Sequence, residues 1–219
     1  MQASAARSIR RAFAAMTFVA ALGVAPAIPL DGGPTASQVL ARVTDRDAHV
    51  ESYATPVRMD IRIRKLLTFH IGLHGTQYYK RPDRLALDIR QIPAQYRKLF
   101  ADLGTPLTWP GAYDLKPVGS NGASGPFHFE GVPKHACDVA RMVLDIDGDP
   151  NAPLHVQWTT RDGGTIDMHI TEQVGEDGFR LPKHADADMA FGGYKVHASI
   201  DYGPYVVNEG VADTVFAGG

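Results

Sequence analysis

The stretch from Val57 to Arg90 alternates apolar and polar side chains, and this alternation limits what the chain can fold into. Successive side chains of a strand point to opposite faces, so such a segment buries one face and wets the other. His74-Gly75 predicts one turn, and Arg81-Pro82-Asp83 predicts another. The stretch therefore predicts an antiparallel meander with one apolar face. Its apolar positions are Val57, Met59, Ile61, Ile63, Phe69, Ile71, Leu73, Leu85, Leu87 and Ile89.

The C-terminal half continues in strands. Arg161-Asp162-Gly163-Gly164 is a strong hairpin signal, and we expect the strand that begins at Phe179 to end at Lys183, next to a proline. A glycine-rich segment, 119–125, predicts a loop. The further strands are expected at 113–118, 141–147, 154–159, 166–171, 179–183 and 194–202.

Helical spacing occurs in two places. Val39, Leu40 and Val43 predict an amphipathic helix within 34–49, and a second helix is predicted over 94–103, with Gly104 placed to end it. Eight or more antiparallel strands with two helices indicate an α+β fold. Since two helices cover little of so large a sheet, we expect a curved antiparallel sheet, an incomplete barrel. Short helices would cover its concave side and leave an apolar pocket.

The N-terminus has the layout of a secretory signal peptide. Arg7, Arg10 and Arg11 precede the apolar run 12–25, and Ala25-Pro26-Ala27 resembles a cleavage site. We expect residues 1–27 to be removed and 28–219 to form a single domain in the periplasm or otherwise outside the cytoplasm. Arg10-Arg11 leaves export by the Sec or the twin-arginine route open.

Charge and cysteine content narrow the functional classes. The 22 basic and 24 acidic residues become 19 and 24 without residues 1–27, which hold three arginines and no acid. A mildly acidic product is not expected to bind nucleic acid. The single cysteine, Cys137, cannot form an intrachain disulfide, so the core must hold the fold. We expect a soluble monomer without a cofactor.

No metal site is predicted from spacing. His70 and His74 would lie about 13 Å apart in an extended strand, too far to share one ion. The other seven histidines occur singly, without ligand spacing. The alternating acids Asp145, Asp147 and Asp149 lack the glycine and distal glutamate of a calcium loop, which favours a solvated strand end.

Nucleophilic catalysis also has little support. There is no G-x-S-x-G motif, and Ser120 and Ser124 lie in the glycine-rich segment. Cys137 follows His135 by two residues, which permits a reactive Cys–His pair, although a structural cysteine is the simpler interpretation. A small hydrolase built from 119–125 with His135 or His128 remains the weakest functional hypothesis.

Glu172 shares the parity of Ile166, Met168 and Ile170. It either faces the apolar side, where a carboxylate needs a partner, or lies at a strand end or bulge that reaches water. Four aromatic residues are candidates for lining a pocket and equally for the core: Tyr78, Tyr79, Phe100 and Trp109.

The segment Tyr78-Tyr79-Lys80-Arg81-Pro82 resembles the LolA/LolB-like superfamily of periplasmic lipoprotein carriers. The layout of an export signal, a first helix, a meander and a long antiparallel second half is similar as well, over most of 35–216. Residues 91–110 depart from the family pattern, because a helix and a proline-bounded loop replace a strand with an Asp-Gly turn and Trp-x-Tyr. That departure leaves the cargo and docking partners open.

The resemblance implies an incomplete barrel closed by helices, with a cavity for acyl chains. By position, Arg81 would hold the lid shut through backbone groups. The expected partners are an acyl chain of a lipoprotein or lipid and transient membrane-bound donor and acceptor proteins. The expected ligand-binding or gating residues are Tyr78, Tyr79, Arg81, Pro82, Leu85, Leu87, Phe100, Trp109, Met142, Leu144 and Glu172.

These observations favour a non-enzymatic carrier or binding protein for an acylated ligand. The alternative is an envelope scaffold whose sheet packs a full core and binds another protein. A solid interior would favour the scaffold, because a carrier needs surplus apolar area.

Overall fold

The computed structural model describes residues 35–44, 49–89, 91–92, 94–118, 126–147, 149, 153–175 and 178–217. The expected signal peptide and the loop 119–125 lie outside these ranges, so both stay predictions, as does the domain boundary at residue 28. No helix within the described ranges is long and apolar enough to cross a membrane.

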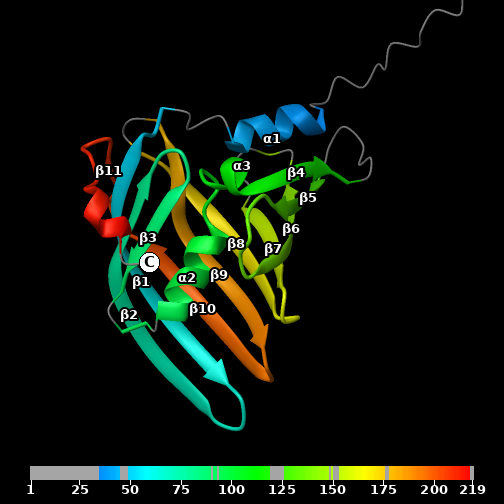
Figure 1. Ribbon diagram of the computed structural model, residues 1–219, viewed down its shortest axis with the longest axis vertical. Helices are drawn as coiled ribbons and strands as arrows, with labels where there is room; N and C mark the ends of the chain where they lie inside the picture. Colours follow the sequence, from blue (N-terminus) through cyan, green and yellow to red (C-terminus); the bar gives the residue numbers. More distant parts are fainter. Residues whose placement is uncertain are drawn as a thin grey trace, which may run out of the picture. The chain divides into compact units, whose positions relative to one another are not determined.

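One antiparallel sheet dominates the fold (Figure 1). Its strand order is β3-β2-β1-β10-β9-β8-β7-β6-β5-β4, and β11 also pairs with β1. Because β3 and β4 end this order and do not pair with each other, the sheet is open, as an incomplete barrel requires. The strands are β1 Ser52–Arg64, β2 Thr68–Lys80, β3 Arg84–Asp88, β4 Tyr113–Pro117, β5 Phe127–Pro133, β6 Val139–Ile146, β7 Leu154–Thr160, β8 Thr165–Val174, β9 Arg180–Phe191, β10 Tyr194–Tyr202 and β11 Val206–Val207.

Within the described ranges, four helical segments accompany the sheet. They are α1 Ala36–Thr44, α2 Ala94–Leu103, α3 Trp109–Ala112 and the 3-10 helix η1 Asp213–Phe216. α1 buries Val39 and Val43 in the main core. α2 begins and ends at the predicted residues, and Gly104 follows it with a φ of +70°. α2 lies across the middle of the sheet, and the β1–β2 hairpin extends past it (Figure 1).

The predicted alternation sets which face is buried. One row of cross-strand partners runs over the sheet from β8 to β2, and all of its members are buried. They are Ile170, Ala185, Ile200, Met59 and Leu73. The intervening residues point to the other face, where charged side chains gather. The inward side chains form one large apolar cluster, and a smaller cluster gathers Val50, Tyr53, Tyr79 and Leu181.

The turn predicted at His74-Gly75 is wrong. β2 continues through both residues, and the chain turns at 65–67 instead. Gly75 is needed for a close approach, because a Cβ there would collide with the carbonyl oxygen of Asp88 and the side chain of Ile89. Glycine at this position therefore marks the place where the chain leaving β3 crosses β2.

The strand predicted over 179–183 is too short. β9 passes through Pro182 and continues to Phe191. A register shift places Glu172 opposite Pro182 and Thr171 opposite His184, so this bulge accommodates the proline. The rest of β9 alternates buried Ala185, Ala187 and Met189 with outward residues, and alanine gives a weak apolar signal. Four further elements were not predicted from the sequence: β5, β11, α3 and η1.

Candidate functional site

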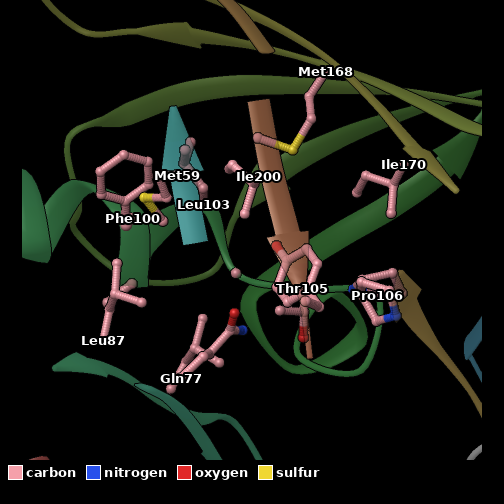
Figure 2. Close-up of a pocket in the computed structure, with 15 residues that line it drawn as sticks. Met59, Gln77, Leu87, Phe100, Leu103, Thr105, Pro106, Met168, Ile170 and Ile200 are labelled. Atoms are coloured by element: carbon pink, nitrogen blue, oxygen red, sulfur yellow. The ribbon is translucent and has the colours of Figure 1, made fainter. Parts of the chain in front are cut away.

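A small cavity lies between α2 and the inner face of the sheet (Figure 2). Its volume is about 50 Å³. Phe100, Met59 and Leu87 lie at one end of the view, and Ile170 and Pro106 lie at the other. The full lining comprises Met59, Gln77, Leu85, Leu87, Phe100, Ala101, Leu103, Gly104, Thr105, Pro106, Met168, Ile170, Pro182, Ile200 and Tyr202.

This cavity is too small for an acyl chain as it stands. Pockets for small molecules usually measure about 300–1,000 Å³, whereas about 10–15 Å³ suffices for one water. Phe100 and Leu103 of α2, and Pro106 after it, line the cavity and limit its size. A chain-like ligand could enter only if α2 moved away from the sheet.

The C-terminal end of α2 is well anchored. The indole Nε1 of Trp109 donates to the carbonyl oxygen of Leu103 at 3.1 Å, and the hydroxyl of Tyr113 donates to that of Asp102 at 2.8 Å. The Thr108 hydroxyl accepts from the Thr105 amide at 2.8 Å. These bonds fix the end of the helix, so a movement of α2 would pivot about residues 102–109.

The polar groups of the cavity are neutral. Gln77 Nε2 donates to the hydroxyl of buried Tyr53 at 3.0 Å. Burial raises the pKa of Tyr202 to about 12 and raises the pKa of Tyr53 still further above its ordinary value. A cavity with apolar walls and a few uncharged hydrogen-bonding groups suits an uncharged or weakly polar ligand.

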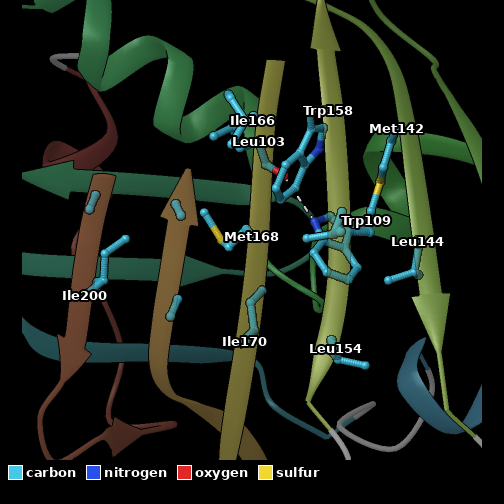
Figure 3. Packing of buried hydrophobic residues seen from close by; sticks show 14 of the residues in the cluster. Leu103, Trp109, Met142, Leu144, Leu154, Trp158, Ile166, Met168, Ile170 and Ile200 are labelled. Atoms are coloured by element: carbon cyan, nitrogen blue, oxygen red, sulfur yellow. Dashed lines mark hydrogen bonds between the residues drawn. The ribbon is translucent and has the colours of Figure 1, made fainter. Parts of the chain in front are cut away.

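Three of the predicted ligand-binding residues line the cavity: Leu85, Leu87 and Phe100. Trp109, Met142 and Leu144 are fully buried in the main core (Figure 3). The two tryptophans, Trp109 and Trp158, pack edge to face, with ring centroids 6.2 Å apart. These core residues therefore support the fold and do not border the cavity.

The two adjacent tyrosines of β2, Tyr78 and Tyr79, lie on opposite faces of the sheet. Tyr79 belongs to the smaller cluster and stacks on Tyr53 at 5.3 Å between ring centroids, while Tyr78 is half-buried on the opposite face of β2. Glu172 is half-buried at the bulge in β8, one of the two arrangements expected for it. Its carboxylate contributes to raising the pKa of Tyr205, after the larger effect of burial.

Arg81 and exposed Pro82 lie at the β2–β3 turn. The Arg81 Nε donates to the carbonyl oxygen of Val50 at 3.3 Å and lies 3.6 Å from the Glu51 carboxylate. Its own amide donates to the Glu51 carbonyl at 2.9 Å. Arg81 thus holds backbone of the segment between α1 and β1; the contacts described for it do not involve α2.

An apolar strip extends from the cavity along the β1–β2 hairpin. Beyond Met59, the inward side chains Ile61 and Ile63 are only half-buried, and their partners Ile71 and Phe69 are 40% and 56% exposed. At the tip, Leu66 is 95% exposed. The alternation in sequence predicts that this strip is buried, because alternation alone cannot show where the covering helix stops.

The cavity is also lined by sheet residues that were not predicted to be site residues. Most of them had been placed on the apolar face, and the missing information was the position of α2. They are Met59, Gln77, Met168, Ile170, Pro182, Ile200 and Tyr202.

The outer face carries histidines and aspartates in neighbouring strands. His155 lies between Asp145 and Asp167, and His184 lies between Asp186 and Asp201. Histidines that are isolated in the sequence are therefore close in space. Asp145 belongs to this array and not to a calcium loop with Asp147. His70 and His74 are exposed on the same face of β2.

The residues considered for hydrolysis are not assembled in the described ranges. His128 contacts Asp145 on the outer face, and His135 is exposed. The Cys137 thiol lies 3.6 Å from the carbonyl oxygen of Val139, to which it donates. Ser120 and Ser124 lie outside the described residues.

Comparison with known proteins gives structural neighbours only. No protein-family model and no curated protein matches the sequence. A domain named for outer membrane lipoprotein sorting, from Vibrio parahaemolyticus, superposes with a TM-score of 0.54 and 11% identity, covering 83% of this chain and 97% of that one. A DUF1329 family protein from Desulfovibrio piger gives 0.52 and 13%, covering 83% and 95%.

A LolA superfamily protein from Nitrosomonas europaea gives a TM-score of 0.52 and 11% identity, covering 84% of this chain and 98% of that one. At such identities the likeness concerns the fold alone. It agrees with the open antiparallel sheet and with the resemblance noted around Lys80-Arg81-Pro82. The chain therefore has the fold of LolA-superfamily and outer-membrane lipoprotein-sorting domains.

Proposed function

We propose that this protein is a non-enzymatic carrier for an acylated ligand, a lipid or the acyl chain of a lipoprotein, in the periplasm. The observation that supports it most is the apolar inner face, which continues past α2 as an uncovered strip. Apolar surface in water is unfavourable by about 25 cal/mol per Å², so this strip favours a ligand that covers it. The similarity in fold to lipoprotein-sorting domains agrees with this role.

The cavity of about 50 Å³ corresponds to a closed form in this proposal. An acyl chain would displace α2, which pivots about its anchored C-terminal end, and would lie along the strip and under the helix. Arg81 would hold the segment between α1 and β1 in place while α2 moves. Donor and acceptor proteins at the two membranes would load and unload the ligand.

A second function follows if α2 never moves. The small cavity and the filled core would then belong to a scaffold, and the exposed strip would bind another protein. The two functions differ in one measurable property, because only the carrier takes up an isolated acyl chain.

The test is uptake of a fluorescent fatty acyl probe by delipidated protein, together with mass spectrometry of lipid bound to the natively purified protein. We expect saturable binding at micromolar concentrations. The double variant Phe69→Ser/Ile71→Ser should weaken it about tenfold, because two apolar contacts worth about 0.7 kcal/mol each are lost. No probe binding at these concentrations would contradict the carrier and favour the scaffold.

His70→Ser is the matched control. His70 is exposed, lies between the two mutated residues, and points to the opposite face of β2. Its replacement should leave probe affinity unchanged. If it weakens binding as much as the double variant does, the probe does not bind along the strip.

A further inference from the structure

The outer face of β7 and β8 brings together three side chains with metal-binding atoms. His155 on β7 is paired directly with His169 on β8, and Asp167 lies two residues before His169 on the same face. The Asp167 Oδ1 is 3.1 Å from Nε2 of His155 and 3.6 Å from Nε2 of His169. One ligand atom from each of the three residues can be chosen so that all lie within 4.8 Å of one another.

Neighbouring groups orient two of these side chains. His155 Nδ1 lies 2.9 Å from the Asp145 carboxylate, so a hydrogen bond from Nδ1 keeps a lone pair on Nε2, which lies 3.1 Å from Asp167 Oδ1 and 3.4 Å from Gln157 Nε2. An ion that binds this lone pair would replace the contact with Gln157. Gln157 Nε2 donates to Oδ2 of Asp167 at 2.7 Å, which leaves Oδ1 directed at the two histidines. A carboxylate behind a ligating histidine is the usual support of a metal site, because it fixes the tautomer and raises the basicity of the ligand.

We propose that His155, Asp167 and His169 form a binding site for a divalent transition-metal ion of the Zn²⁺ type. Two imidazoles and one carboxylate suit Zn²⁺, Cu²⁺ or Ni²⁺, whereas Mg²⁺ and Ca²⁺ require oxygen ligands. Three protein ligands leave a coordination position for water or for a group of another molecule. The site faces away from the cavity, so it is separate from the proposed carrier function.

Binding requires a local adjustment of the two rings. They are stacked, with centroids 4.4 Å apart and planes 7° apart, so their lone pairs do not yet converge on one point. The last torsion of histidine is broad, so the exposed ring of His169 can turn while Asp145 keeps the ring of His155 in place. With metal–ligand bonds of about 2.0–2.1 Å, the ligand atoms would separate to roughly 3.4 Å, close to the distances already present.

The experiment uses tag-free protein that has been treated with a chelator and then titrated with Zn²⁺ by calorimetry and thermal unfolding. We expect one ion per chain at this site. At a hundredfold excess over the dissociation constant, the melting temperature should rise by about 5–10 °C. Mg²⁺ should produce no rise, and lowering the pH to 5 should weaken Zn²⁺ binding, since protons compete for the histidines.

His169→Ala is the principal variant, because this side chain is 60% exposed and its loss should not disturb folding. It should weaken Zn²⁺ binding at least tenfold, and Asp145→Asn should weaken it by about 10- to 100-fold through His155. His184→Ala is the matched control: His184 also lies between two aspartates on the outer face, but it belongs to no three-residue cluster of this kind among the described residues.

Affinity that is unchanged in His169→Ala would overturn the proposal. An equal loss in His169→Ala and His184→Ala would overturn it as well, because the ion would then bind histidines at large. The absence of Zn²⁺ binding to the unmodified protein is the third contrary result.

Discussion

Trp109 ties the end of α2 to the core of the sheet. It is fully buried, packs on Trp158 and donates its indole N–H to the carbonyl of Leu103. We expect Trp109→Ala to lower the free energy of unfolding by about 3–5 kcal/mol, through lost packing and an unpaired carbonyl. Urea denaturation measures this. Leu66→Ala, at a 95% exposed position, should change it by less than about 0.5 kcal/mol; comparable losses would mean that Trp109 is not the anchor.

His184 couples stability to pH. Its hydrogen bond with Asp201, and a second one with Asp186, raise the pKa of the imidazole despite partial burial. A raised pKa in the folded state adds stability that is fully present below the unfolded pKa of about 6.5 and is lost as the pH rises through the folded value.

The melting temperatures of the original protein and of His184→Ala should therefore differ more at pH 5.5 than at pH 8.5. Asp201→Asn removes the partner with the largest effect on the pKa of His184. In that background, the effect of His184→Ala on the melting temperature should depend less on pH. A difference that is equal at both pH values would show that the imidazole contributes packing and not charge.

At the scale of elements, α2 depends on the glycine that ends it. Gly104 has a φ of +70°, and a Cβ there would collide with the Thr108 hydroxyl. Gly163, in the β7–β8 turn, has a φ of +85° with open space around it. Gly163→Ala should lower the free energy of unfolding by about 1–2 kcal/mol, through backbone strain alone.

Gly104→Ala should lower the free energy of unfolding by at least about 1 kcal/mol more than Gly163→Ala does, because the hydrogen bond from the Thr105 amide to the Thr108 hydroxyl would also be disturbed. Comparing the two variants by urea denaturation isolates the contribution of the α2 connection. If the two variants lose the same free energy of unfolding, the Thr108 side chain can move aside without destabilising the protein. The connection after α2 would then be less rigid than its hydrogen bonds indicate.

For the whole molecule, the pairing of β1 with β10 joins the two halves of the chain. The ladder runs from Val57–Tyr202 to Arg64–Lys195 and makes the sheet continuous. Both tryptophans lie on the side of β4–β8, whereas the Tyr53–Tyr79 stack belongs to β1 and β2. We expect one cooperative transition, with the same midpoint by tryptophan fluorescence and by far-ultraviolet circular dichroism. Separate midpoints would show that the halves unfold independently.

The alternation of side chains determined much of this architecture without tertiary information. A period of two residues assigns both the strand and its buried face, and helical spacing with a terminal glycine defined α2 to the residue. These signals depend only on residues that are close together in the sequence, so they can be read without knowing the tertiary structure. The same logic placed Leu85, Leu87 and Phe100 on the side that borders the cavity.

Only the tertiary structure decided which strands became neighbours and what covered them. Sequence could not show that a bulge in β8 lets β9 pass Pro182, that only a small cavity separates α2 from the sheet, or that Phe69 and Ile71 stay exposed. Nor could it bring His155 to His169, since strand pairing sets that distance. Faces follow from short-range periodicity, whereas cavities and clusters depend on packing between residues far apart in the chain.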